Sequence, residues 1–460
     1  MSRLIRYAKK LLESNILTFP QQRYTSSQQP IKDYDLLVVG GGIMGVSTAR
    51  EMLKRHPFLK IAIVEKESKL ATHQSGHAKG IIYTGLLCSP GSLNAKLCIE
   101  GYRLACTYIY EKRIPHKKCG KLIVATHRDE IKNLMNLYKN GIENDVPNLT
   151  ILRNQDEIQK VEPFCRGIKA LWSPETCIVN WVKVVDSLAK DFKANSGDII
   201  LNFKVRKLTE TKGDKAEEYP ITVHGCLDND ILHAKNVLTC AGLQSDLLAK
   251  KTGCSIEPRP IPFRSEQLQL AKERQHMVKG IIYSVPKTRL SFLVPHFTSR
   301  LDESVLYGPS TLLALGREGY KSHDASIIDL FNVLRYPGFM KLVSHNFGLS
   351  VEEFRKSVYL SSQVTQFQKL IPELKISDVK RASAGVAAVA VNRDGSLMEE
   401  IVLHRSIGNS PLSTKVIHCR SFPSPGATNS LAIAKIIANA IELEFDIGDR
   451  WCDSTSYAIL

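Results

Sequence analysis

Three glycines, Gly40, Gly42 and Gly45, connect the apolar run "YDLLVVG" to the segment "IMGVSTAREMLKRH". The continuous apolar run predicts a buried strand, and the segment after it predicts a helix that ends before Pro57. A second apolar run, "KIAIVEK", predicts the next strand and closes at Glu65. A G-x-G-x-x-G turn between a strand and a helix, followed by an acid at the end of the next strand, is typical of a dinucleotide-binding βαβ unit.

Each residue of this unit has an expected task. Gly40 permits the tight turn, Gly42 lets backbone N–H groups approach a pyrophosphate, and Gly45 lets the helix and strand pack closely. The helix N-terminus then faces the phosphate charge. Glu65 is expected to accept hydrogen bonds from an adenosine ribose, which argues against a 2′-phosphate. A glycine-rich turn without a ligand is the alternative, but strand, helix and acid in register favour the dinucleotide.

Three later segments favour FAD over NAD. The loop "LATHQSGHAKGIIYTG" can pass beneath an isoalloxazine ring, and "NVLTCAGLQSD" predicts a strand that ends in a second close approach to the dinucleotide. "FPSPGATNSLAIAK" predicts a helix whose N-terminus meets the flavin N1/O2 locus, where negative charge develops. Besides the glycine motif and Glu65, the predicted cofactor-binding residues are Lys66, Gln74, Ser75, Gly76, Lys79, Gly80, Val205, Ala241, Gly242, Gly385, Pro425, Gly426, Ala427 and Thr428.

The expected fold class is α/β, with a Rossmann-like FAD-binding domain and an inserted, mixed α+β substrate domain. Helical periodicity is predicted over 93–111, and "DIILNFKVRKLTE" is predicted to be one strand. The region from about Pro258 to Ile376 mixes strand-like and helical pieces and differs in pattern from the rest. We expect the FAD-binding domain to comprise 33–110, 165–257 and 377–450, and the substrate domain to comprise 111–164 and 258–376.

Composition sets limits on other classes. The 460 residues are 43% hydrophobic and contain no apolar run long enough to cross a bilayer. The net charge of +16 is spread without a basic block interleaved with aromatics, so no nucleic-acid partner is expected. The 11 cysteines form no CxxC pair and no closely spaced Cys/His set, which argues against disulfides and a metal site. Residues 1–32 are rich in Arg and Ser and poor in acids, which predicts a mitochondrial presequence.

The chain resembles the FAD oxidoreductases of the D-amino-acid-oxidase type from about Asp33 to Phe445. The motifs that carry the resemblance are "VVGGGIMG", "HQSGHAKGIIYTG", "CGKLIVA", "VEPFCRGI", "LTCAGLQSD", "IPFRSE", "REGY" and "PSPGATNSLAI". Within the family, the chain is most similar to the subgroup that oxidises L-2-hydroxyglutarate to 2-oxoglutarate. The resemblance implies electrons that leave FAD for an acceptor other than oxygen, such as a quinone or an electron-transfer flavoprotein. It also implies a mitochondrial location with peripheral contact to the inner membrane.

That reaction needs a base for the hydroxyl proton and cations for two carboxylates of a small dicarboxylate substrate. For the base we name His296 in "VPHFT", with His77 as the second choice. For the carboxylates we name Arg264 and Lys121, of which Arg is the better bidentate partner. Each has a plainer interpretation, since a single His in a strand is often a packed residue and "PFR" can be a strand-entry ion pair.

Four positions depart from the family pattern at the presumed chemical face: Lys79, Tyr83, Ser265 and Ala387. Tyr83 and Ala387 replace an expected His and Arg, and Lys79 adds a charge where Ser is usual. These departures keep two alternatives open. One is a flavoenzyme that acts on another small acid, an amine or an amino acid, and the other is an FAD-binding protein with little catalysis.

Overall fold

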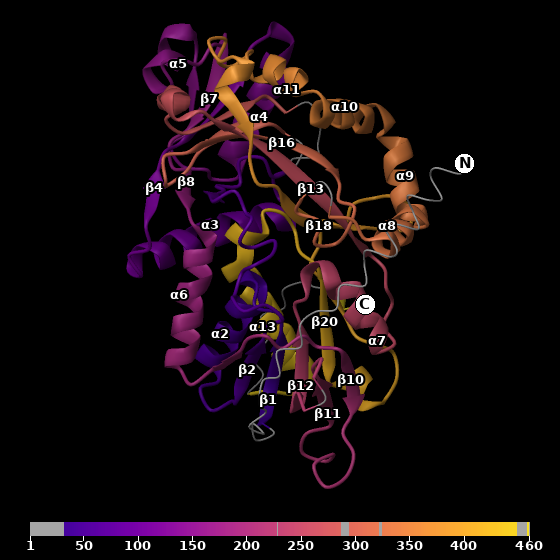
Figure 1. The fold of residues 1–460 in the computed structure, drawn as a ribbon. Helices are drawn as coiled ribbons and strands as arrows, with labels where there is room; N and C mark the ends of the chain where they lie inside the picture. The colour runs from indigo at the N-terminus through magenta and orange to yellow at the C-terminus, as the bar shows by residue number, and fades with distance from the viewer. Residues whose placement is uncertain (1–31, 228, 287–293, 322–323, 449–457, 460) are drawn as a thin grey trace, which may run out of the picture. The chain divides into compact units, whose positions relative to one another are not determined.

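The computed structural model describes residues 32–227, 229–286, 294–321, 324–448 and 458–459. The predicted presequence lies outside the described residues, apart from Lys32 at the start of the first strand. Residues Asp33–Leu460 form one compact unit. Two nine-stranded sheets and a small three-stranded sheet build this unit (Figure 1).

The first sheet carries the glycine motif. Its strands are β1 (Lys32–Val39), β2 (Ile61–Val64), β9 (Asp198–Ile200), β10 (Lys207–Glu210), β11 (Ile221–His224), β12 (Ile231–Thr239), β19 (Val402–His404), β20 (Val416–Ser421) and β21 (Ala458–Ile459). The order is β21-β19-β20-β12-β1-β2-β9, and β10 and β11 extend from β12. The pairs β1–β2, β2–β9 and β12–β20 are parallel. A parallel sheet entered through a strand–helix–strand unit is the Rossmann-like arrangement predicted from the sequence.

Both faces of this sheet are covered, which explains its continuous apolar runs. The surrounding helices are α2 (Ile43–Arg55), α3 (Leu93–Glu111), α6 (Trp181–Ala194), η2 (Gly242–Gln244), α7 (Ser245–Lys251), α12 (Pro411–Thr414) and α13 (Gly426–Phe445). Leu36 and Val38 face the core formed with α2, α3, α6 and α13, whereas Leu37 and Val39 face the core formed with β10 and β11. Helix α3 begins and ends where the sequence predicts.

The stretch 198–210 differs from the prediction of a single strand. It forms β9, which pairs with β2, and β10, which pairs with β11. Between them Asn202 has a φ of +60°, and Phe203 N donates a hydrogen bond to Glu65 O. The backbone therefore leaves the sheet edge at Asn202, because pairing with the end of β2 competes with a continuous strand.

The second sheet is mostly antiparallel. Its strands are β5 (Lys121–Ala125), β6 (Thr150–Leu152), β7 (Lys169–Ser173), β13 (Arg259–Leu270), β14 (Ile281–Ser284), β15 (His296–Ser299), β16 (Val305–Leu313), β17 (Val379–Arg381) and β18 (Gly385–Val391). The order is β17-β13-β16-β15-β14-β5-β7-β6, and β18 pairs with β13. Strands β5 and β14 run parallel, although 155 or more residues separate them in sequence, as their register Ile281–Lys121 shows. A third, small sheet contains β3 (Ile81–Ile82), β4 (His116–Lys118) and β8 (Cys177–Val179).

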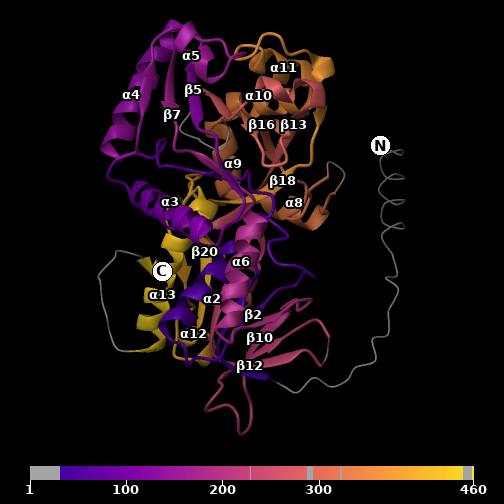
Figure 2. The ribbon, with the colours of Figure 1, turned by 90° about the vertical axis from the view of Figure 1, so that its left-hand side faces the viewer.

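Helices pack against the second sheet. They are η1 (Arg128–Glu130), α4 (Ile131–Glu143), α5 (Gln155–Val161), η3 (Lys272–Met277), α8 (Ile327–Leu334), α9 (Pro337–His345), α10 (Phe347–Val358), α11 (Leu360–Phe367) and η5 (Ile376–Asp378). Figure 2 shows α8 to α11 (orange) grouped beside β13, β16 and β18. Among the described residues, no helix has the length and apolar character needed to cross a membrane. The predicted domain boundaries stay a prediction. Strand pairing places β7, β17 and β18, which lie in ranges predicted for the FAD-binding domain, in the second sheet.

Candidate active site

The glycine turn between β1 and α2 is closely packed on one side and open on the other. Gly40 has a φ of +122°, and a Cβ there would lie 2.4 Å from Cys240 O. A Cβ at Gly45 would lie 2.0 Å from Gly40 O. At Gly42 the nearest atom to a Cβ would be Ser75 Oγ, at 3.3 Å. Gly40 and Gly45 are therefore required by the packing of the turn, whereas Gly42 leaves its backbone approachable.

Glu65 lies at the end of β2, as the sequence predicts, and is 8% exposed. Its Oε2 accepts a hydrogen bond from Gly41 N (2.7 Å), and its Oε1 accepts one from Glu67 N (3.0 Å). A carboxylate has about four acceptor positions, so both oxygens retain capacity for further donors. Glu65 is thus held by the backbone in a position suited to ribose hydroxyls.

The loop after β2 bridges the glycine turn and the second sheet. Ser75 Oγ accepts a hydrogen bond from Ile43 N (3.0 Å), the first residue of α2. Gln74 Oε1 accepts one from Ala388 N (3.1 Å) in β18. Glycines along this path lie where a Cβ would come within 3.0 Å of another segment or turn: Gly76, Gly80 and Gly385. The predicted cofactor residues of this loop therefore meet those of β18 in space.

The C-terminal turn supplies a third side. Pro425 precedes α13, whose first turn contains no acid and no side-chain cap. Thr428 Oγ1 accepts a hydrogen bond from Tyr83 N (3.2 Å). Asn429 is fully buried, yet neither its Oδ1 nor its Nδ2 has a partner. A buried amide without partners is costly, so Asn429 is suited to bind a polar group of the cofactor. Asn429 is not among the residues predicted from the sequence, and its only signal there is its polar side chain directly after Thr428.

The remaining predicted cofactor residues surround the same turn. Ala241 and Gly242 lie just after β12, and Cys240 N between them and the strand donates a hydrogen bond to Val39 O (2.7 Å), next to Gly40. Val205 packs against the core beneath β2. Early, central and late segments thus lie near the N-terminus of α2, and their binding of the dinucleotide stays a prediction.

A segment just after β16 closes over this region and was not assigned a role from the sequence. Lys66 forms ion pairs with Glu67 (3.0 Å) and with Glu318. Arg317 binds Asp246, with Nη2 and Oδ2 2.8 Å apart. These ion pairs tie the second sheet to the first beside the predicted cofactor path. Lys66 is therefore engaged in this contact.

The predicted base lies in a row of side chains on three adjacent strands. In the registers of β14, Tyr283 lies opposite His296 on β15 and Ile123 on β5, and Lys121 is two residues before Ile123. Side chains two apart in a strand share a face, so Lys121, Tyr283 and His296 lie on the same face of the second sheet. The imidazole of His296 stacks on the Tyr283 ring with centroids 3.9 Å apart.

His296 has a defined tautomer. Its Nδ1 lies 2.8 Å from Val294 O, which can only accept, so Nδ1 carries the hydrogen. Nε2 is then the basic nitrogen, and it lies 3.2 Å from Tyr283 OH and 3.3 Å from Lys79 Nζ. Burial, followed by the nearby Lys79 charge, holds the pKa of His296 well below its ordinary value. His296 is therefore a neutral, oriented imidazole, as a general base requires.

Lys79 contacts this base and Lys121 lies over the ring of Tyr283, and neither lysine has a carboxylate partner among the described residues. Burial lowers the pKa of Lys79 to about 7 and that of Lys121 to about 8. Lys121 is 2% exposed, and its Nζ lies 4.1 Å from the centroid of the Tyr283 ring and 5.6 Å from that of Tyr83. Unpaired buried ammonium groups are unfavourable, so both lysines are suited to bind an anion.

The other two predicted catalytic residues lie in different surroundings. Arg264 on β13 forms an ion pair with Glu266, and only 11% of its side chain is exposed. Its Nε is buried and has no partner. His77 stacks on Tyr320, with centroids 4.4 Å apart. Tyr283 is not among the residues predicted from the sequence, where its only signal is its place in the apolar run "IIYS".

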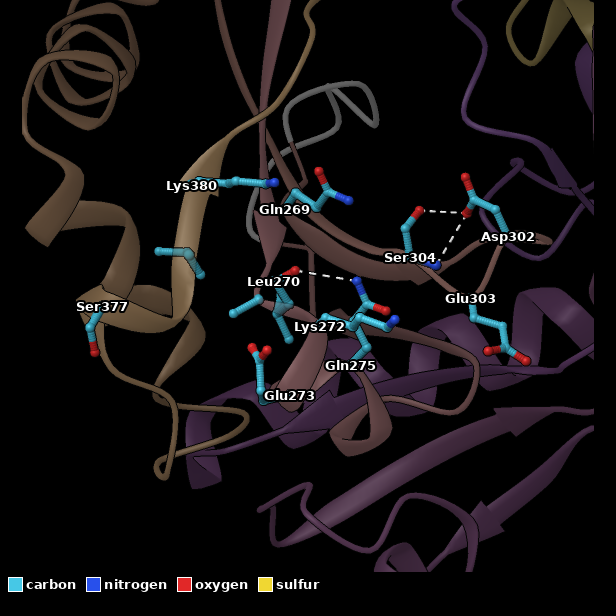
Figure 3. A pocket seen from close by; sticks show the side chains of 12 residues that line it. Gln269, Leu270, Lys272, Glu273, Gln275, Asp302, Glu303, Ser304, Ser377 and Lys380 are labelled. Carbon is cyan, nitrogen blue, oxygen red and sulfur yellow. Dashed lines mark hydrogen bonds between the residues drawn. The ribbon is translucent and has the colours of Figure 1, made fainter.

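The departures from the family pattern also take definite positions. Tyr83 follows β3; its backbone N–H donates to Thr428 Oγ1, and its ring centroid lies 5.6 Å from Lys121 Nζ. Ser265 pairs with Gly385, and Ala387 pairs with Phe263, across β13 and β18. A hollow of about 770 Å³ on the second sheet contains none of the predicted site residues (Figure 3). It is lined by side chains such as Lys272, Glu303 and Lys380, and lies apart from the residues described above.

Residues 35–440 match the family of FAD-dependent oxidoreductases. The chain belongs to this family and is an FAD-dependent oxidoreductase. It is 41% identical over 419 residues to the mitochondrial L-2-hydroxyglutarate dehydrogenase of Homo sapiens, covering 90% of each chain. It is 43% identical over 406 residues to that of Caenorhabditis elegans, covering 88% of this chain and 92% of the relative. The resemblance found in the sequence is confirmed.

Solved structures confirm the expected fold class. L-α-glycerophosphate oxidase from Mycoplasma pneumoniae, solved with FAD bound, superposes with a TM-score of 0.67 at 22% identity, covering 90% of this chain and 95% of that chain. Glycine oxidase from Geobacillus kaustophilus gives a TM-score of 0.63 at 15% identity, covering 92% and 97%. FAD is thus the cofactor of this chain, and the open glycine turn, Glu65 and the unpaired amide of Asn429 fit it.

Proposed function

We propose that this protein oxidises L-2-hydroxyglutarate to 2-oxoglutarate, and that it does so in mitochondria. Relatives that share 41–43% identity over about nine tenths of the chain are named for this activity and this compartment. The substrate is a small dicarboxylate with a hydroxyl group on C2. Its oxidation removes a hydride from C2 and a proton from the hydroxyl group.

In this reaction one residue transfers the proton and others bind the carboxylates of the substrate. FAD, when bound, supplies the hydride acceptor. Nε2 of His296 takes the hydroxyl proton, because Val294 O keeps the hydrogen on Nδ1 and the lone pair on Nε2. Lys121 binds one carboxylate, since it is a buried cation on the same sheet face. Arg264 is proposed for a carboxylate as well, which requires its guanidinium to share its contact with Glu266.

One observation carries the proposal. A neutral imidazole of fixed tautomer contacts the half-buried Lys79 and stacks on Tyr283, over whose ring the buried Lys121 lies. No described carboxylate forms an ion pair with either lysine. This combination of one base and two free cations matches a 2-hydroxy acid that bears two negative charges. A substrate amine would gain nothing from the two cations and would be repelled by them.

The departures at Tyr83 and Ala387 favour a second candidate, an FAD-dependent oxidoreductase for another small acid. Ala387 lies on β18 beside β13, and no arginine is available at that position. A pocket with fewer donors accepts a different anion or turns over the same one more slowly. His296 and the two lysines suit L-2-hydroxyglutarate and another small acid equally, so a direct test must distinguish the two substrates.

We also propose that the electron acceptor is a quinone or an electron-transfer flavoprotein, reached from the surface of the inner membrane. Helices α8 and α10 support this contact, because they expose apolar side chains at helical spacing: Ile327, Phe331 and Leu334, and Phe347, Val351, Phe354 and Val358. Three exposed basic residues lie beside them: Arg335 directly after α8, Lys341 on α9 and Arg355 on α10. An exposed apolar stripe with basic neighbours suits an anionic bilayer surface.

Anaerobic mixing of the FAD-loaded protein with L-2-hydroxyglutarate tests the proposed reaction. Bleaching of the flavin absorption band at a saturable rate is expected, with 2-oxoglutarate formed in an equal amount. The D-isomer serves as the control and should leave the band unchanged. Bleaching only by another 2-hydroxy acid establishes the second candidate, and a band that no 2-hydroxy or 2-amino acid bleaches contradicts both.

A further inference from the structure

Resting on the proposed function, we infer that Lys79 is a specificity-determining residue: its ammonium group pairs with the carboxylate next to the reacting hydroxyl and thereby frees Nε2 of His296. Lys79 stands in the loop before β3, 217 residues from His296 in sequence. The contact between them joins the cofactor loop to the second sheet. A counter-charge for the substrate does not by itself require that Lys79 contact Nε2 of His296, so this contact needs a separate explanation.

The geometry at Nε2 of His296 explains why Lys79 must move away or share its ammonium hydrogens with another acceptor. A neutral imidazole has a single lone pair on Nε2, and Lys79 Nζ approaches it to 3.3 Å. An ammonium group only donates, so this contact occupies the lone pair that should receive the hydroxyl proton. A carboxylate competes for the same ammonium hydrogens and binds them more strongly than a neutral nitrogen does. The C1 carboxylate of a 2-hydroxy acid lies one bond from the hydroxyl-bearing carbon and is therefore the group within reach of Lys79.

The charges around His296 agree with this assignment. The groups that face it are Lys79, Tyr283 and, beyond Tyr283, Lys121. Tyr83 contacts Tyr283, and the thiols of Cys88 and Cys98 lie near Lys121. None of these is a carboxylate. The nearby cations suppress protonation of His296 in the free protein, and a bound carboxylate on Lys79 removes part of that suppression when the base is needed.

The two lysines together select substrates with two negative charges. The stacked imidazole of His296 covers one face of the Tyr283 ring, so Lys121 Nζ, 4.1 Å over that ring, lies over the other face. A ligand with one carboxylate at Lys79 can place a second toward Lys121 across the width of the ring. A monocarboxylate leaves one buried lysine unpaired, which is the less favourable state.

The test compares Lys79→Met with Lys79→Arg in the FAD-loaded protein. Lys118→Met is the matched control, because Lys118 is a nearby lysine that is 54% exposed and already paired with Glu175. Glutarate lacks the hydroxyl group and cannot be oxidised, and butyrate carries a single carboxylate. Titration of the flavin absorption spectrum with each anion gives its Kd, and the pH dependence of kcat/KM for L-2-hydroxyglutarate gives the pKa of the free base.

We expect Lys79→Met to raise the Kd for glutarate at least tenfold and to reduce the preference for glutarate over butyrate. The acid limb of the kcat/KM profile should move to higher pH, because the cation that suppresses His296 is gone. Lys79→Arg and Lys118→Met should keep the wild-type limb. If the Met variant does not retain FAD, Lys79→Gln carries the same test.

The outcomes separate this inference from the proposed function. A Met variant with wild-type affinity for glutarate and an unmoved acid limb overturns the role of Lys79, while turnover of L-2-hydroxyglutarate still stands. A wild-type protein that L-2-hydroxyglutarate does not reduce overturns the proposed function. In that case the glutarate titration alone decides whether Lys79 binds a dianion.

Discussion

At the scale of single residues, the site depends on a few buried charged groups held by the backbone. Glu65 is anchored by Gly41 N and Glu67 N, and His296 by Val294 O. In each case a main-chain group orients the side chain and leaves other atoms for a ligand. Among the described residues, no main-chain group orients Lys79 or Lys121 in this way, and their ammonium groups are available to bind an anion.

Glu65→Ala is expected to weaken FAD retention while the protein still folds. Loss of hydrogen bonds to a charged group costs about 1.5–3 kcal/mol, or roughly a ten- to hundredfold rise in the Kd for FAD. Flavin content after gel filtration measures this. Glu65→Gln keeps the shape and one acceptor, so its flavin content should fall between those of the wild type and the Ala variant. Unchanged flavin content in the Ala variant would contradict the role assigned to Glu65.

Arg264→Ala is expected to raise the KM for L-2-hydroxyglutarate by about tenfold, the scale of one lost charged hydrogen bond, while flavin loading stays near wild type. The reason is that Arg264 is proposed to bind a carboxylate although it is paired with Glu266 in the free protein. Steady-state kinetics and flavin content on the same preparation check it. Equal losses in KM and flavin loading would show that the Arg264–Glu266 pair is structural.

At the scale of elements, the turn from β1 into α2 combines two demands on glycine. Gly40 and Gly45 satisfy the packing of the turn against Cys240 O and against Gly40 O itself. At Gly42 a Cβ would meet only Ser75 Oγ, at 3.3 Å, so the absence of a side chain there chiefly serves the approach of a ligand. The same turn thus contains positions that matter for folding and one that matters for binding.

Gly42→Ala and Gly45→Ala should therefore differ. The first is expected to fold, with a Tm of the FAD-free protein close to wild type, and to lose most bound FAD because its methyl group blocks the phosphate path. The second should lower the yield of folded protein, since its Cβ would lie 2.0 Å from Gly40 O. Thermal denaturation and flavin content of both variants decide it, and similar behaviour of the two would argue against the division.

At the scale of the whole molecule, buried histidines make the stability of the fold depend on pH. Buried histidines lie in the first sheet: His418 binds Thr239 Oγ1 (2.8 Å) and Thr252 Oγ1 (2.7 Å). Burial lowers the pKa of His418 to about 3 and that of His404 to about 4. Both values lie below the unfolded value of about 6.5, so the unfolded chain binds protons first as the pH falls.

Stability should accordingly be full above about pH 6.5 and decline toward lower pH. At pH 5.5 each neutral buried histidine of this kind costs about 1 kcal/mol of stability relative to pH 7.5. The Tm measured at the two pH values checks this. His418→Gln removes one titrating group, so its Tm should fall less between pH 7.5 and 5.5, and an identical fall would exclude His418 as a contributor.

The apolar stripe of α10 should bind anionic vesicles. Phe347→Ser combined with Phe354→Ser is expected to reduce cosedimentation with vesicles that contain an anionic phospholipid by at least tenfold, because two exposed aromatic side chains are lost. Phe58→Ser is the control, since Phe58 is 76% exposed after α2. Equal binding by the wild type, the double variant and the control would rule out a contact through α10.

Much of the cofactor site follows from local sequence. The strand–glycine–helix–strand–acid order from Asp33 to Glu65 is a contiguous pattern, and the helix over 93–111 follows from its own periodicity. The cofactor, the family and the fold class follow from these motifs and were confirmed by the comparisons. Local backbone preferences and short-range packing determine such units, so a single sequence contains the information.

The surroundings of the base were decided only by the tertiary structure. Lys79, Tyr283 and His296 come from a cofactor loop and two strands of the second sheet, and their contact depends on long-range strand pairing. The burial of Asn429 without a hydrogen-bond partner for its amide is likewise a property of the tertiary structure. Sequence patterns show which residue types can perform the chemistry. Which of them meet, and with what charge, depends on the packing of segments far apart in sequence, such as Lys79 and His296, which are 217 residues apart.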